Sequence, residues 1–204
     1  MPSSGVTGVA LNVTVTEPTV AGFLTVWPSG EPRPFTATHT FVPGLTIGNL
    51  ALAKVGANGR VSIFNSSGSA QIIADVVGYF SAAGGAFVPV APRRLMDTRD
   101  GTGGVLGQIA ADGSISVTLA NGSPVPPAAT AVVVNVTSVN SSSMSFITAW
   151  PTGSARPFAA TMNPRPGVPV PNQAYLKLGP DGRLSLYNFT GSTDVVIDLF
   201  GYIS

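Results

Sequence analysis

Residues 72–80 read IIADVVGYF, and residues 195–203, which lie 123 positions further along the chain, read VVIDLFGYI. In both stretches β-branched and aromatic residues follow one another around a single acidic residue, Asp75 or Asp198. A run of this length and composition is typical of a buried β-strand, and it is too short and too interrupted to cross a membrane as a helix. The return of the same pattern indicates that the chain contains two related β-units.

The similarity extends outward from these strands over residues 5–81 and 128–204, without a gap. Of the 77 aligned positions, 31 are identical. A duplication of this extent organises the whole chain. The shared motifs include Asn12-Val13-Thr14, Trp27-Pro28, Arg33-Pro34-Phe35, Pro43-Gly44 and Gly59-Arg60, each with its counterpart 123 positions later.

The segment between the two repeats, residues 82–127, occurs only once. If this segment opens each repeat, residues 87–204 form a complete domain and residues 1–86 form a unit that lacks its opening strands. The alternative is that the segment bridges two shorter units. We expect the division into 1–86 and 87–204.

The local patterns favour an all-β fold. Polar and apolar residues alternate with period 2, and no convincing amphipathic helix is present. Asn58-Gly59 and Asp181-Gly182 each separate two such runs, which is a strong hairpin signal. With 24 Gly and 18 Pro as turn residues, we expect two homologous β-sandwich units of jelly-roll or immunoglobulin-like type in tandem, with a barrel as the second choice.

The composition excludes several classes of protein. Hydrophobic residues make up 44% of the chain, so an intrinsically disordered protein is excluded. Charged residues make up only 9%, with a net charge of +1 and no basic cluster, so we expect no nucleic-acid partner. The absence of cysteine excludes disulfides and thiol catalysis, and the single histidine excludes multi-histidine metal sites. We expect no membrane insertion either.

Four motifs together resemble a known family. They are Pro92-Arg93-Arg94-Leu95-Met96-Asp97-Thr98-Arg99, Ala131–Thr137, Ala149-Trp150-Pro151 and Asp198-Leu199-Phe200-Gly201-Tyr202. The chain is similar to the tandem extracellular β-repeats of secreted and surface proteins from actinobacteria and related high-GC bacteria. The resemblance covers residues 87–204 as a full repeat and 5–81 as a truncated one. It implies an extracellular, non-catalytic β-module.

The same resemblance implies where a cysteine pair would stand. Some members of the family carry the pair at the positions that Ser29 and Ser62 occupy here, and at those of Thr152 and Ser185. Packing alone would then hold this chain together. Residues 1–5 have neither the basic nor the apolar segment of a signal peptide, which departs from the family.

The sequence offers little that could carry catalysis. Among the acidic residues only Asp75 and Asp198 recur in both repeats, and each interrupts an apolar strand. We interpret them as structural carboxylates that meet a backbone amide or an arginine such as Arg99, because an unpaired carboxylate in such a strand is costly. His39 has Met162 as its counterpart, and the Asp/Gly-rich loop 97–104 lacks the alternation of a calcium loop. We therefore expect no catalytic residues, no metal and no cofactor.

Trp27 and Trp150 stand at equivalent strand ends, each followed by proline. An exposed tryptophan there could stack on a sugar ring. Arg33 and Arg156, six residues on, could instead cover the indole through a cation–π contact. We favour a structural anchor over a carbohydrate platform at these four residues.

Low charge and a mean hydropathy of +0.36 are unusual for a freely soluble monomer. An open edge in residues 1–86 is what strand addition repairs, either by residues 87–127 of the same chain or by those of the next subunit. We therefore expect a structural or adhesive extracellular protein that assembles with itself into a fibre, coat or surface array. A carbohydrate-binding module with a glycan partner is the alternative, and a phage virion or fibre protein is a further one.

Overall fold

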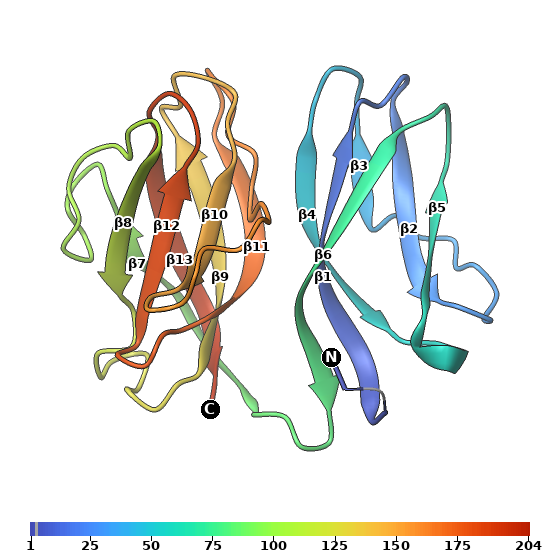
Figure 1. The fold of residues 1–204 in the computed structure, drawn as a ribbon, viewed down its shortest axis with the longest axis horizontal. Coiled ribbons are helices and arrows are strands. Elements are labelled where there is room, and N and C mark those ends of the chain that lie inside the picture. Colours follow the sequence, from blue (N-terminus) through green and yellow to red (C-terminus); the bar gives the residue numbers. More distant parts are fainter. Residues whose placement is uncertain (3) are drawn as a thin grey trace. The chain divides into compact units, whose positions relative to one another are not determined.

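The computed structural model describes residues 1–2 and 4–204 and shows an all-β, sandwich-type fold built from antiparallel sheets (Figure 1). The chain divides into two compact units, which we call unit 1 (Met1–Gly84) and unit 2 (Gly85–Ser204). In the described part of the chain the one helical segment is the short 3-10 turn η1 (Ala57–Gly59).

Unit 1 contains two three-stranded sheets, in the orders β4-β1-β6 and β3-β2-β5. The long strand β1 is central in the first sheet, with β6 at one edge, and β2 is central in the second. The strand bounds are β1 (Val6–Thr16), β2 (Gly22–Pro28), β3 (His39–Phe41), β4 (Ile47–Lys54), β5 (Val61–Asn65) and β6 (Gln71–Ser81).

Unit 2 has one more strand in its first sheet, β11-β9-β13-β7, and its second sheet has the order β10-β12-β8. The segment that occurs once in the sequence supplies β7 and β8, which lie at one edge of each sheet. The strand bounds are β7 (Phe87–Asp97), β8 (Gly113–Thr118), β9 (Ala131–Val139), β10 (Ile147–Pro151), β11 (Val170–Lys177), β12 (Arg183–Asn188) and β13 (Asp194–Ile203).

The strands that both units contain pair with each other in the same register in the two units. Leu11 of β1 lies opposite Val76 of β6, and 123 residues later Val134 of β9 lies opposite Leu199 of β13. The offset also relates β1–β4 to β9–β11, and β2–β5 to β10–β12. Strand register is set by which side chains must face the core, so the repeated hydrophobic pattern produces the same ladders twice.

The hairpins predicted at Asn58-Gly59 and Asp181-Gly182 are wrong, although both dipeptides lie at turns. Each turn joins strands of two different sheets, β4 to β5 and β11 to β12, which do not pair with each other, because the chain crosses between the sheets there. Asn58 and Gly59 both have positive φ, 65° and 66°. In the second turn Gly182 is left-handed with φ 67°, whereas Asp181 is not among the positive-φ residues. A Cβ atom on Gly182 would also lie 2.6 Å from the Ala120 carbonyl oxygen, so glycine is required there for two reasons.

The strands β7 and β8 belong to unit 2, where β7 pairs with β13 and β8 pairs with β12. In the described part of unit 1, β6 pairs only with β1 and β5 pairs only with β2. The cores differ accordingly. Among the described residues, unit 2 encloses 20 buried hydrophobic residues in its core and unit 1 encloses eight.

This difference predicts unequal costs for equivalent substitutions. Leu199 is fully buried, so Leu199→Ala should lower the free energy of unfolding by about 2–5 kcal/mol. Val76 occupies the matching position but is 50% exposed, so Val76→Ala should change that free energy by about 0.5 kcal/mol or less. Urea unfolding of each variant, monitored by hydrogen exchange in each unit, would measure both changes in the free energy of unfolding. Equal costs at the two positions would contradict this picture of the cores.

Candidate functional site

The candidate site is the side of unit 1 at which β5 and β6 have no second neighbour among the described strands. We call this region, Val61–Asn65 together with Gln71–Ser81, the open side. In unit 2 the counterparts of β5 and β6 are β12 and β13, which have β8 and β7 as their outer neighbours. Each residue of the open side can therefore be compared with an equivalent residue of unit 2 that lies beside a further strand.

The strand β6 exposes side chains that its counterpart β13 buries. Ile73 is 49% exposed, whereas the equivalent Val196 is 3% exposed and has Asp97 of β7 as its neighbour across the sheet. The contrast between Val76 and Leu199 is of the same kind. Along the rest of the strand, further apolar side chains are exposed, namely Val77, Tyr79 and Phe80.

The strand β5 repeats this contrast in the second sheet. Ile63 is exposed, but its counterpart Leu186 is fully buried next to β8, where it lies opposite Ile115. Val61 is half-buried, and its counterpart Leu184 is fully buried. Both edge strands of unit 1 on this side therefore carry exposed apolar side chains, and neither has a second neighbouring strand among the described residues.

Gly78 lies in β6, with open space around it. A Cβ atom built on Gly78 would have Ala10 Cβ, at 3.9 Å, as its nearest neighbour. The equivalent Gly201 is covered by β7: a Cβ atom there would collide with the Phe87 ring and lie 2.6 Å from the Val88 carbonyl oxygen. Gly201 is thus required by the close approach of β7, while the same glycine in unit 1 has nothing over it.

The two repeated carboxylates are in different environments. Arg94 of β7 donates to both oxygens of Asp198, from Nε at 3.0 Å and from Nη2 at 3.4 Å. Asp75, the counterpart of Asp198, has no ion pair within the described residues, and partial burial raises its pKa. The open side therefore contains a partly desolvated carboxylate at the position where unit 2 binds an arginine.

Asp198 meets an arginine, as one of the expected partners, but this arginine is Arg94 and not Arg99. Arg99 instead pairs with the buried Asp97, with Nη2 at 2.6 Å from one carboxylate oxygen and Nε at 2.9 Å from the other. Arg94 also reaches Asp97, through Nη1 at 3.0 Å. These donors, with the Arg99 side chain as the largest contributor, lower the pKa of Asp97 to about 2.

The outer strand of unit 2 is protected against further pairing, and β6 is not. The strand β7 contains Pro89 and Pro92, which cannot donate backbone hydrogen bonds to a further strand. The strand β6 contains no proline, and Asp75 is its single charged residue. An unprotected apolar edge of this length is suited to the addition of another strand.

The tryptophans at the strand ends anchor loops. Trp27 Nε1 donates to the Glu31 carbonyl oxygen at 3.0 Å, and Trp150 Nε1 donates to that of Ser154 at 3.1 Å. Both indoles are half-buried. The nearby arginines lie over other rings: the Arg33 guanidinium carbon is 3.6 Å from the centroid of Phe64, and the guanidinium carbon of Arg156 is 3.5 Å from that of Tyr187.

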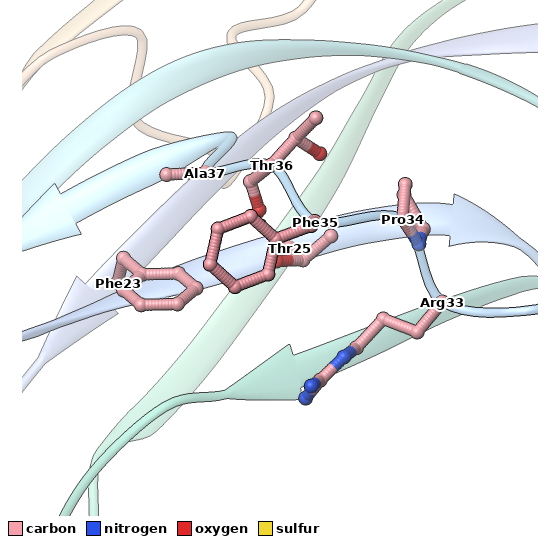
Figure 2. A pocket seen from close by; sticks show the side chains of 7 residues that line it. All are labelled: Phe23, Thr25, Arg33, Pro34, Phe35, Thr36 and Ala37. Atoms are coloured by element: carbon pink, nitrogen blue, oxygen red, sulfur yellow. The ribbon is translucent and has the colours of Figure 1, made fainter.

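The chain segment that follows Trp27 lines a mostly apolar hollow of about 220 Å³ in unit 1. Figure 2 shows Phe23, Phe35 and Arg33 among the side chains around it. Phe35 and its counterpart Phe158 are fully exposed. Sequence reasoning missed these two residues, although the repeated Arg-Pro-Phe motif was the signal that could have identified them.

The positions at which the family resemblance implies cysteine pairs carry hydroxyl pairs. Ser29 Oγ lies 2.7 Å from Ser62 Oγ, and Thr152 Oγ1 lies 2.8 Å from Ser185 Oγ. Each pair joins the end of one strand to the neighbouring strand of the same sheet, so hydrogen bonds link these positions in both units.

The other candidates for chemistry lie apart from one another. His39 is buried, its Nε2 lies 2.9 Å from the Ile47 carbonyl oxygen, and desolvation lowers its pKa. In loop 97–104 the Asp100 carboxylate accepts the Thr102 backbone N–H at 2.9 Å, which closes a turn. Within residues 1–2 and 4–204, no three His, Cys, Asp or Glu side chains gather closely enough to hold a metal ion.

Fold and site together define the chain as an all-β protein in which one sandwich-type unit is complete and the other is open along one side. No protein-family model matches the chain, and no curated protein matches it in sequence. In the described part of the chain, no helix has the length and apolar character that a membrane span requires.

The Asp97 cluster makes stability dependent on pH. The pKa of Asp97 in the folded protein lies below the ordinary value of an aspartate. Its contribution to the free energy of unfolding is therefore present above about pH 4 and is lost as the pH falls through about 2. Asp97→Asn should lower the free energy of unfolding by about 1–2 kcal/mol at pH 7, with the partly exposed arginines reducing the effect. Urea unfolding at pH 7, 4 and 2 should show this difference shrinking.

The matched control is Glu31→Gln, which removes an exposed ion pair with Lys54 and should cost only a few tenths of a kcal/mol. An effect of Asp97→Asn that is as large at pH 2 as at pH 7 would argue against an ionic origin.

Proposed function

We propose that this protein is a non-catalytic, extracellular structural or adhesive β-module that assembles through the open side of unit 1. The observation that carries the proposal is the exposure of β5 and β6 at positions where unit 2 buries apolar side chains beside β7 and β8. An open sheet edge gains main-chain hydrogen bonds and apolar burial together when another strand joins it.

The composition supports an assembling protein. With 9% charged residues, the chain has few of the lysines and glutamates that usually keep sheet edges apart. The resemblance of residues 87–204 to repeat modules of bacterial secreted and surface proteins supports the extracellular setting.

Simple counting favours edge-to-edge contact over strand exchange between copies. Residues 1–2 and 4–204 contain two positions for a β7–β8 segment, one in each unit, and one such segment. If a copy gave its segment to the unit 1 of a neighbour, its own unit 2 would become open. The number of open sides among the described strands would stay the same, so exchange offers no gain. In the pure protein, copies should therefore associate through their open sides.

A carbohydrate-binding module is the second candidate, favoured by the full exposure of Phe35 and Phe158 at repeated positions. The hollow beside Phe35 is lined mainly by apolar groups and by Arg33, and a sugar ring could stack there on the exposed phenyl face (Figure 2). The half-buried indoles of Trp27 and Trp150 would then support the loop without touching the sugar.

Light scattering on a sizing column tests the assembly. The wild-type mass should exceed 20.7 kDa and rise with concentration, because an apolar edge is free. Val76→Lys places a charge in the middle of that edge and should restore the mass of a single chain. Leu106→Lys, which changes an equally apolar exposed residue outside the open side, is the matched control and should leave the mass as in the wild type.

A wild-type protein that runs as a single chain at every concentration would overturn self-association through the open side. So would equal effects of Val76→Lys and Leu106→Lys, because the contact would then not be specific to β6.

Glycan-array binding tests the second candidate. The double variant Phe35→Ala, Phe158→Ala should lose retention on any glycan that the wild type binds, while its unfolding midpoint stays unchanged because both rings are fully exposed. Retention that is equal in the double variant and the wild type would exclude a sugar platform at these residues.

A further inference from the structure

We infer that the open side of unit 1 is an acceptor for an extended strand of a second polypeptide, which carries an arginine that pairs with Asp75 and an aromatic residue, seven positions earlier, that covers Gly78. This inference rests on the proposed function, since it names the partner of the same open side. Three features of unit 1, each with a filled counterpart in unit 2, support it.

The first feature is register. In unit 2, β7 runs antiparallel to β13, with Arg94 opposite Asp198, Pro89 opposite Gly201 and Phe87 opposite Ile203. Subtracting the repeat offset of 123 places the same strand on β6, with its arginine opposite Asp75 and its aromatic residue opposite Phe80. The pairings of β1 with β6 and of β9 with β13 agree in register, so the edge offered by β6 has the spacing that β7 requires.

The second feature is charge. Asp198 receives a two-point contact from the Arg94 guanidinium, which is the geometry that a carboxylate favours. Asp75 sits in an apolar strand, is partly desolvated, and has no cation within ion-pairing distance among the described residues. An incoming arginine would supply the missing charge, and lysine would do so less well because it cannot contact both oxygens in one plane.

The third feature is the open space above Gly78. In unit 2 the Phe87 ring lies so close to Gly201 that no side chain fits there. In unit 1 no ring lies against Gly78 in this way, and a Cβ atom placed on it would meet nothing nearer than Ala10 Cβ at 3.9 Å. Glycine weakens a strand unless something packs closely against it. An aromatic side chain of the added strand fits that place.

These features favour a donor strand over a second copy of β6. If two β6 strands paired antiparallel about a twofold axis in full overlap, their Asp75 residues would lie close together near the centre of the pair. Like charges facing each other across a sheet are destabilising. A donor with an arginine reverses the sign of this interaction. A strand of the β7 kind should therefore bind the open side more tightly than a second copy of β6 does, and edge-to-edge contact between copies is expected where no such strand is present.

The probe is a fluorescent peptide with the sequence of residues 86–99, AFVPVAPRRLMDTR, added to the full-length protein. Anisotropy should show saturable binding to the wild type. Asp75→Asn should weaken binding roughly tenfold, the size expected for a hydrogen-bonded charge pair. The peptide change Arg94→Ala should weaken binding to the wild type by a similar factor. Asp75→Asn in the protein combined with Arg94→Ala in the peptide should weaken binding little more than either change alone, because both changes remove the same interaction.

Gly78→Val identifies the binding site. The valine side chain occupies the open space, and the nearest atom in the free protein leaves room for it, so the variant should fold normally and lose peptide binding at least tenfold. Two controls are needed. The variant Leu106→Lys should bind the peptide as the wild type does, and a scrambled peptide should not bind to the wild type. Binding that Gly78→Val leaves intact would overturn the inference, because the peptide would then bind elsewhere.

The two proposals fail in different ways. If the peptide binds and Gly78→Val abolishes this, but Asp75→Asn and Arg94→Ala have no effect, the arginine-bearing donor is overturned while the open side stands as a docking surface. If no peptide binds but the wild type self-associates through Val76, the donor strand is overturned and self-assembly stands. If the peptide binds to a protein that is a monomer at every concentration, the donor strand is supported and self-association is overturned.

Discussion

The structure depends on whether a further strand pairs with the last strand of each unit, which is β6 in unit 1 and β13 in unit 2. A sandwich buries apolar side chains only where both of its sheets extend far enough to enclose them. In unit 2, β7 and β8 extend the two sheets on the same side, and β13 and β12 become enclosed between their neighbours. Unit 1 has the equivalents of β13 and β12 but no described strand beyond them. The same hydrophobic pattern thus produces a large core in unit 2, whereas unit 1 has a smaller core and exposed apolar side chains along β5 and β6.

The ionic contacts follow from this covering. An aspartate within an apolar strand is stable when a cation meets it, and Arg94 reaches Asp198 only because β7 lies beside β13. Arg94 also contacts Asp97, which in turn holds Arg99, so one edge strand carries a connected set of charges at the margin of the core. Without an added strand, Asp75 lacks the whole of this arrangement.

Much of the fold could be predicted from the sequence, because it is carried by local signals. Alternating hydrophobicity, Gly-containing turns and the ungapped repeat predict an all-β sandwich-type fold, which is confirmed. The sequence predicts a backbone amide or an arginine such as Arg99 as the partner of Asp198. The partner is an arginine, but it is Arg94, because the choice between Arg94 and Arg99 depends on strand order and on a register shift between Ile197 and Asp198. The repeated Arg-Pro-Phe motif could have drawn attention to Phe35, but the exposure of its ring could not be predicted, since a hydrophobic residue beside proline gives no sign of which way its ring points.

Unit 1 keeps two features that are unfavourable in an isolated sheet and favourable in a completed one. A glycine within a strand costs about 0.5–1 kcal/mol relative to alanine, and a partly buried, unpaired carboxylate adds desolvation to that cost. At Gly201 and Asp198 the neighbouring strand offsets both, through the Phe87 ring and the Arg94 guanidinium. Local departures of this kind tend to mark functional sites, where the compensating group comes from outside the unit. In the proposed complex with a donor strand, the pair formed by Gly78 and Asp75 would distinguish β6 from an edge that is merely apolar: the apolar side chains would accept many partners, and these two residues would select among them.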